Sequence, residues 1–178
     1  MAKRGYNRDT IRGGASEWDV SRPFSSYLRL LGHLLAHPIR FFELLPKTPD
    51  PRAPALFLVF SGLLAAIVWL LAGGVYPALV ALVLPLPLSL VLAGPYHLAA
   101  WGGRYGYVVT WRVLAYPLGY LVPLTAVPGL RWVAAVYAGV LLLAIGLAVV
   151  KGISFGRAFL SCLVVTGLLF AAYPALPG

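Results

Sequence analysis

Carboxylates are the side chains that this sequence most clearly lacks. All five Asp and Glu residues of the 178-residue chain lie in its first fifty positions, and none occurs from Ala53 onward. General acid–base catalysis at neutral pH usually needs a sheltered carboxylate or histidine, and ion-coupled transport usually needs ionisable groups inside the membrane. The absence of carboxylates after residue 52 therefore argues against an enzyme and against an ion-coupled transporter.

Cysteine and charge are scarce as well. Cys162 is the single cysteine, so no internal disulfide can form, and no Cys/His spacing of the zinc type is present. Charged residues make up 11% of the chain, against about 25% in average soluble domains. Hydrophobic residues make up 61%. This composition predicts an all-α, polytopic membrane helical bundle without catalytic, cofactor-binding or metal-binding residues.

Apolar runs that begin at Ala53 are long enough to cross a membrane. About 20 apolar residues in a helix span a hydrocarbon core of about 30 Å. The runs predict five transmembrane helices in one membrane domain, residues 53–178; they cover residues 53–72, 76–100, 108–127, 132–150 and 155–173. The pairs Gly73-Gly74 and Pro128-Gly129 mark turns between successive helices.

Prolines interrupt the second and third predicted helices. They are Pro85, Pro87 and Pro95 in the second, and Pro117 and Pro123 in the third. We expect these prolines to kink the helices, with neighbouring groups satisfying the freed carbonyls. The alternative is a small transporter or channel subunit, in which both helices are broken and backbone groups form a site. That alternative predicts a polar-lined cavity near the middle of the membrane.

Basic residues are distributed asymmetrically about these helices. With five spans and a cytoplasmic N-terminus, thirteen of the fourteen Lys and Arg residues fall on the cytoplasmic side, and Arg131 falls on the other. Positive residues are retained on the cytoplasmic side of membranes. The distribution predicts a multi-pass protein with its N-terminus in the cytoplasm and its C-terminus on the opposite side.

Two segments precede the membrane domain. Residues 1–22 are polar and predict a flexible cytoplasmic N-terminus. Residues 23–52 predict an amphipathic interfacial helix in the membrane plane and a Pro-rich linker, with Pro38 dividing the helix. Its apolar residues lie opposite a polar stripe and are expected to insert at the cytoplasmic leaflet, together with Phe41; they are Phe24, Leu28, Leu31, Leu35 and Phe42.

Eight basic residues are candidates for contact with lipid phosphate or a partner, because they lie in the polar stripe or near the cytoplasmic loops: Arg29, His33, His37, Arg40, Arg104, Arg112, Lys151 and Arg157. His33 and His37 have a spacing that can hold a metal ion, but the neighbouring arginines disfavour a cation. His97 is expected to be a hydrogen-bonded structural histidine. Expected partners are membrane lipids, other membrane proteins or a second copy of the chain. The basic residues form no dense block of the nucleic-acid-binding type.

The stretch Arg112–Phe159 has the most specific pattern in the chain. A basic residue precedes an Ala-Tyr pair, a Pro-interrupted apolar run follows, and a Pro-Gly turn leads into a run containing Trp132. A Lys-Gly-Ile-Ser loop at residues 151–154 is followed by Arg157-Ala158. Together with the lead-in HPIRFFELLP, this pattern resembles the Yip family, the Ypt/Rab-GTPase-interacting-protein domain, over about residues 25–173.

The resemblance implies a five-span, non-enzymatic membrane adaptor, scaffold or membrane-organising factor with a cytoplasmic N-terminus. Eukaryotic members act in vesicle trafficking and bind small GTPases through their N-terminal region. The corresponding residues 1–52 have no long acidic or aromatic-rich domain, so small-GTPase binding is not expected. The compact N-terminal region and the abundance of Ala, Leu, Val and Gly predict a prokaryotic cytoplasmic membrane.

Overall fold

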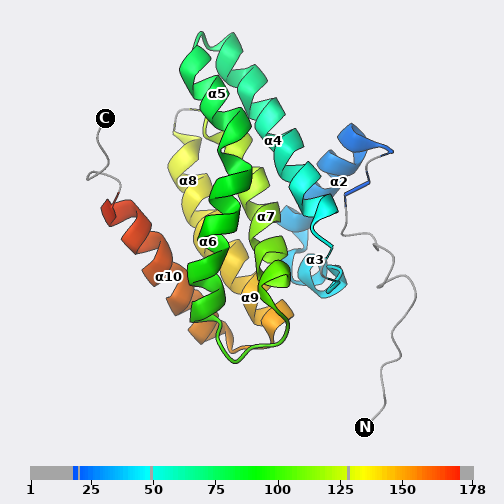
Figure 1. Ribbon diagram of the computed structural model, residues 1–178, viewed down its shortest axis with the longest axis vertical. Coiled ribbons are helices and arrows are strands. Elements are labelled where there is room, and N and C mark those ends of the chain that lie inside the picture. The colour runs from blue at the N-terminus through cyan, green and yellow to red at the C-terminus, as the bar shows by residue number, and fades with distance from the viewer. Residues whose placement is uncertain (1–17, 20, 49, 128, 173–178) are drawn as a thin grey trace.

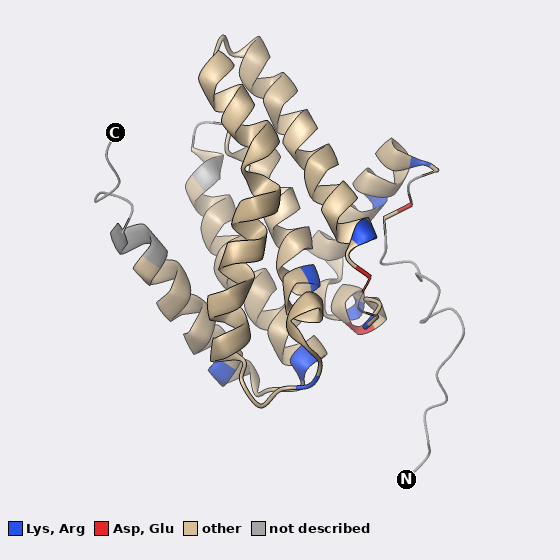
Figure 2. Cartoon of the chain, in the orientation of Figure 1, with Lys and Arg blue, Asp and Glu red and all other residues tan. Residues whose placement is uncertain are grey.

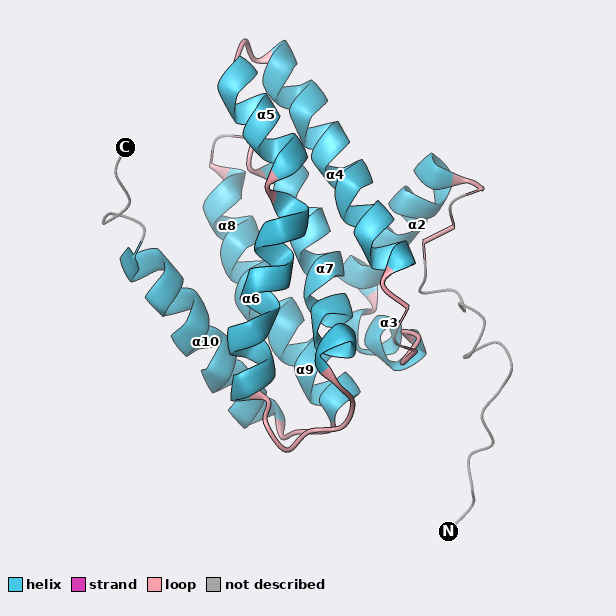
Figure 3. Cartoon of the chain, viewed as in Figure 1, coloured by secondary structure: helices cyan, strands magenta, loops and turns pink. Residues whose placement is uncertain are grey.

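The computed structural model describes residues 18–19, 21–48, 50–127 and 129–172, and the side chains in these ranges except those of Arg131 and residues 169–172. Across these ranges the chain is all-α and contains no β-strand (Figure 1; Figure 3). The helices are α2 (Pro23–Ala36), α3 (Pro38–Leu44), α4 (Arg52–Leu71), α5 (Val75–Val83), α6 (Pro85–Ala99), α7 (Tyr107–Leu124), α8 (Leu130–Val136), the π-helix η1 (Tyr137–Leu142), α9 (Leu143–Lys151) and α10 (Phe155–Ala172).

Two helical stretches are long and apolar enough to cross a membrane. One is α4, and the other is Trp132–Lys151, which runs without a break through α8, η1 and α9; each has 20 residues. The pair α5 and α6 also qualifies if the two helices are taken as one bent span. The described part of the chain therefore holds two or three candidate spans, at the positions of the first, second and fourth predicted helices.

The third and fifth predicted spans are helical but do not meet the same criterion. Helix α7 has 18 residues, and Arg112, two prolines and three tyrosines reduce its apolar character. In α10 the apolar stretch within the described side chains is shorter, Phe155–Leu168. Both helices run alongside the candidate spans (Figure 1). A total of five spans stays a prediction.

The second predicted span is bent by 53° between α5 and α6. Pro85 opens α6 and has no N–H, so it cannot donate to the Ala81 carbonyl one turn earlier. Helix α4 comes very close at this point because Gly62 has no side chain: a Cβ there would lie 2.8 Å from the Ala81 oxygen. The span is thus broken where we expected a kink. Helix α7, by contrast, continues through Pro117.

Helix α7 lies at the centre of the bundle. Every residue from Val109 to Pro117 is buried, so all sides of this part of the helix are covered. A helix covered on all sides is surrounded by other helices, and α4, α6 and α9 all contact α7. The polar groups of this part of α7, including that of Arg112, therefore face protein.

Helices α2 and α3 dock on the bundle through aromatic side chains. Tyr27 of α2 stacks on Phe57 of α4 with ring centroids 5.1 Å apart, and Phe41 of α3 meets Tyr116 of α7 at 5.4 Å. The Tyr27 hydroxyl also donates to the Gly119 carbonyl of α7 at 3.4 Å. Aromatic pairs of this kind each contribute about 0.5–1.5 kcal/mol beyond their buried area. The N-terminal helices are therefore part of the protein core.

The prediction that Phe41 and Phe42 insert into lipid is wrong. Both are 0% exposed, and Phe42 packs so tightly on α9 that a Cβ at Gly146 would lie 2.8 Å from its ring. The bundle, rather than the bilayer, covers this apolar face. Helix α2 nevertheless keeps an outward apolar surface, since Phe24 is 59% exposed and Leu28 is 54% exposed.

Most of the predicted flexible N-terminus, residues 1–17 and Val20, lies outside the described residues. Trp18 is described and is buried. Its indole N–H donates to the Pro23 carbonyl at 3.0 Å, and its ring packs on Phe60 with centroids 5.7 Å apart. Trp18 therefore belongs to the packed part of the molecule.

Candidate functional site

Basic residues gather at one end of the bundle and around α2 and α3 (Figure 2). That end is formed by the loop between α6 and α7, residues 100–106, and by the loop between α9 and α10, residues 152–154. We call it the basic end. Four of the predicted contact residues lie at or near it: Arg104, Arg112, Lys151 and Arg157.

Arg112 of α7 is fully buried and holds the linker between α3 and α4. Its Nη1 donates to the Pro46 carbonyl at 2.9 Å, and its Nη2 donates to the Asp50 carbonyl. A guanidinium presents its donors in a fixed fork, which allows one side chain to bind two carbonyls of the same segment. Arg112 therefore ties the linker to the central helix.

Lys151, the last residue of α9, is 1% exposed and connects the end of α9 to the loop 100–106 and to α6. Its Nζ donates to the Tyr105 carbonyl at 2.7 Å and lies 3.2 Å from Nδ1 of His97. A lysine ammonium can only donate, so Nδ1 of His97 is the acceptor in this contact. The main-chain N–H of Arg104 donates to the Lys151 carbonyl at 2.8 Å. This is a second hydrogen bond between the loop 100–106 and the end of α9.

His97 is hydrogen-bonded, as the sequence suggested. Besides its contact with Lys151, its Nδ1 lies 2.9 Å from the Thr110 hydroxyl of α7. The imidazole therefore joins α6 to α7 and to the end of α9.

Arg104 and Arg157 stay exposed at the basic end. Arg157 donates from Nη2 to the Trp101 carbonyl at 2.7 Å. The Trp101 side chain itself is 69% exposed. An outward-facing tryptophan flanked by two arginines is typical of a membrane–water interface.

The predicted polar stripe of α2 and α3 lies at the surface. Arg29, His37 and Arg40 are exposed, and His33 is half-buried with its ring 5.9 Å from that of Phe41. Burial chiefly, and the charges of His37, Arg40 and Arg29 in addition, lower the pKa of His33. Within the described ranges, no group of three or more His, Cys, Asp or Glu residues is placed to hold a metal ion.

The structure places six of the eight predicted contact residues at or near the surface and buries the other two. Arg112 and Lys151 do not face lipid or a partner, because loops fold over them and their cationic groups bind main-chain carbonyls. The role of the remaining six stays a prediction.

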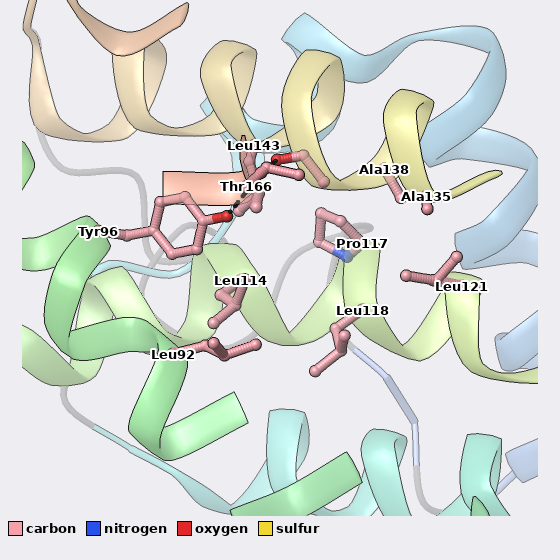
Figure 4. Close-up of a pocket in the computed structure, with 11 residues that line it drawn as sticks. Leu92, Tyr96, Leu114, Pro117, Leu118, Leu121, Ala135, Ala138, Leu143 and Thr166 are labelled. Carbon is pink, nitrogen blue, oxygen red and sulfur yellow. Dashed lines mark hydrogen bonds between the residues drawn. The ribbon is translucent and has the colours of Figure 1, made fainter. Parts of the chain in front are cut away.

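An apolar cavity of about 220 Å³ lies between α6, α7, η1 and α10 (Figure 4). Aliphatic side chains such as Leu92, Leu114 and Leu143 form most of its wall. Its side-chain polar groups are the hydroxyls of Tyr96 and Thr166. We call this space the lateral cavity.

The hydroxyls of the lateral cavity form a directed chain of hydrogen bonds. The Thr166 Oγ1 donates to the Gly139 carbonyl of η1 at 3.2 Å, and the Tyr96 hydroxyl lies 3.1 Å from the same Oγ1. A threonine hydroxyl has one proton to give, so Tyr96 must be the donor to Thr166. Figure 4 shows the Tyr96 hydroxyl directed at Thr166.

A second cavity, of about 360 Å³, lies beside the bend between α5 and α6. Trp69, Pro77 and Leu84 are among its lining residues, and Leu118 of α7 contributes to both cavities. Both walls are almost entirely apolar. Neither is the polar-lined cavity that the transport alternative predicted.

Sequence reasoning did not find the lateral cavity. Tyr96 and Thr166 are isolated polar residues in apolar runs that lie far apart in the chain. A polar residue in such a run usually bonds to a neighbouring helix, which was the one signal available. It does not identify the partner.

Comparisons of this chain with models of known protein families, with curated proteins and with solved structures found no match. The residues described above are therefore the basis for a functional proposal.

Proposed function

We propose that this chain is a non-enzymatic integral membrane protein of the Yip type that acts as a membrane adaptor or scaffold. The observation that carries the proposal is the placement of its charges. Basic residues lie at the basic end and along α2 and α3 (Figure 2), while many exposed large hydrophobic residues lie along α4, α5 and α6. Such a molecule would keep its sides in lipid and offer its basic end to a partner in the cytoplasm.

Five spans with a cytoplasmic N-terminus are part of the proposal. The loops that would both be cytoplasmic, residues 100–106 and 152–154, lie at the same end of the bundle, where the Arg104 main-chain N–H donates to the carbonyl of Lys151 at the end of α9. The turn at Gly73-Gly74, which would face the other side, lies at the opposite end of the bundle (Figure 1). This arrangement supports alternation of the chain across a membrane.

The interior polar groups support a non-enzymatic role. The Ser61 hydroxyl donates to the Phe57 carbonyl at 2.8 Å, and the Trp111 indole donates to the Ser89 hydroxyl at 2.8 Å. His97 is likewise engaged by Thr110 and Lys151. Groups held in this way satisfy buried polar atoms and would have to give up structural bonds to act on a substrate.

Helix α2 would add a lipid contact to the scaffold. Phe24 and Leu28 form an outward apolar surface, and the exposed Arg29 and Arg40 lie close enough in the sequence to reach headgroup phosphates. An amphipathic helix with this composition binds at the interface between headgroups and acyl chains. Anionic lipid would strengthen that contact.

Site-specific photo-crosslinking in native membranes tests the adaptor role. A photoreactive amino acid replaces Trp101 at the basic end or, as a matched control, Tyr76 near the other end; these residues are 69% and 79% exposed. We expect a discrete protein adduct from position 101 that is lost when Arg104 and Arg157 are both changed to Gln. Adducts with lipid alone from both positions would contradict the proposal.

A small transporter or channel subunit is the second candidate, and the 53° bend between α5 and α6 favours it. Proteoliposomes containing the purified chain would be tested for leakage of protons, potassium and small neutral solutes. Flux that falls when Pro85→Ala restores a helical N–H would support transport. Leakage equal to that of empty liposomes would remove this candidate.

A further inference from the structure

We propose that the lateral cavity binds an aliphatic alcohol, a single apolar chain that ends in a hydroxyl group. This site is separate from the basic end, so the proposal does not depend on the scaffold function. It follows from three properties of the cavity: its size, its uncharged wall and the direction of the hydrogen bonds between Tyr96, Thr166 and Gly139.

The size of the cavity suits the end of one chain. An engineered apolar cavity of about 150 Å³ binds benzene, which has six heavy atoms. By proportion, the volume of about 220 Å³ holds on the order of nine heavy atoms. The cavity is partly open to the bundle surface, so a longer chain can extend outward from it.

The two hydroxyl groups in the cavity wall favour a ligand that can donate a hydrogen bond. Because Thr166 gives its proton to the Gly139 carbonyl and Tyr96 gives its proton to Thr166, the Tyr96 oxygen is left as an acceptor. A phenolic oxygen that donates can still accept. The group that complements it is a hydroxyl on an otherwise apolar molecule.

The rest of the wall disfavours charged ligands. None of the described residues that line the cavity carries a charge. A carboxylate or phosphate buried without a cation or several donors is costly, so a fatty acid or a phospholipid headgroup does not fit. An ether or alkane of the same size would fill the space but would have no proton to give to Tyr96.

Small residues of the candidate span Trp132–Lys151 create the space. Ala135, Ala138 and Gly139 line the cavity where the helix changes to the π-helix η1. Single π-helical turns occur frequently at functional sites. A larger side chain at Ala135, which is half-buried, would fill the cavity without removing either hydroxyl.

Photolabelling of the full chain in lipid nanodiscs tests the proposal. The probe is octan-1-ol carrying a diazirine group, with labelled peptides identified by mass spectrometry. We expect saturable labelling of α6 and α10 peptides. Unlabelled octan-1-ol should compete about tenfold better than 1-methoxyheptane, which has the same number of heavy atoms but no donor. Equal competition, or non-saturable labelling spread over many helices, would overturn the proposal without any variant.

Three variants locate the site. Tyr96→Phe should abolish the preference for the alcohol over the ether, and Ala135→Leu should abolish saturable labelling. Tyr120→Phe, a matched change of a half-buried tyrosine outside the cavity lining, should leave both unchanged. A variant is compared only if its elution volume in size-exclusion chromatography matches that of the unmodified chain, which shows that it is folded. A Tyr96→Phe protein that is folded and keeps the full preference would show that the alcohol does not bind at this hydroxyl.

Discussion

Arg112 shows how a permanent charge can sit inside an apolar bundle. Its side chain reaches from the central helix to the linker between α3 and α4, where main-chain carbonyls accept its protons. Burying a cation is expensive unless its donors are satisfied, and here the acceptors come from a segment that has no secondary structure of its own. Arg112 therefore stabilises the linker, and the linker carbonyls in turn satisfy the buried charge of Arg112.

Replacing Arg112 with Leu should lower stability. The Pro46 carbonyl would lose its donor while buried, which costs about 1–3 kcal/mol. Unfolding by heat or by SDS in detergent micelles measures the change. Arg104→Leu is the control, because that side chain is exposed and should cost less than about 0.5 kcal/mol. Equal losses in the two variants would contradict the role assigned to Arg112.

His33 should titrate below the ordinary histidine value of about 6.5, because burial and nearby positive charge lower its pKa. The unfolded chain then binds this proton more tightly than the folded chain does. Acidification through the ordinary histidine range should therefore reduce the free energy of unfolding, and the loss should be absent at higher pH. NMR titration of the imidazole measures the pKa. Arg40→Gln should raise it, and an unchanged value would show that Arg40 has no influence.

The burial of single basic residues could not be read from the sequence. The sequence identified basic residues around loops that it predicts to be cytoplasmic, yet Arg112 and Lys151 are inside the protein. The position of a basic residue next to an apolar run does not show whether a loop folds back over that end of the helix. The contacts of Lys151 come from residues such as Tyr105, which is distant in the sequence.

At the level of elements, the contact between α4 and α5 depends on Gly62. Gly62→Ala should destabilise the bundle by about 1–3 kcal/mol, because its Cβ would lie 2.8 Å from the Ala81 oxygen, a backbone atom that cannot move alone. Gly94→Ala is a matched helical control, since no atom lies within 4 Å of its Cβ position. Both are compared by SDS unfolding. If Gly94→Ala proves equally destabilising, the close approach at Gly62 is not the cause.

Helix positions could be read from the sequence, but their shapes could not. The apolar runs and Pro38 placed the helices within a few residues of those observed, from α2 to α10. The sequence could not show which proline breaks its helix. Pro85 marks a 53° bend, whereas Pro117 lies within a continuous helix. The two prolines also differ in their surroundings: α4 approaches closely beside the break at Pro85, where Gly62 has no side chain, whereas Pro117 lies in a part of α7 that is buried on all sides.

At the scale of the whole molecule, the proposed topology predicts which positions can be labelled from outside an intact bacterial cell. In a Cys162→Ala background, a cysteine at Tyr76 should react with a membrane-impermeant maleimide. A cysteine at Ser154, which is also exposed, should react after the membrane is permeabilised. The reverse pattern would place the N-terminus outside, and labelling of both in intact cells would contradict the alternation of spans.

The overall class of the molecule followed from its composition, because so few charges cannot make a soluble surface. The helical architecture was confirmed, and two or three candidate spans agree with the predicted ones. The lateral cavity was not foreseen. It arises where α6, α7, η1 and α10 meet, and no single run of sequence contains that junction.

The docking of Phe42 against Gly146 has a consequence for synthesis. Residue 42 is made well before residue 146, a delay of roughly 5–20 seconds at typical elongation rates. Throughout that interval helix α9 is not there to cover Phe42, and Phe41 likewise needs Tyr116 of α7 as a neighbour. The N-terminal helices can therefore reach their final positions only after the second half of the chain has been made.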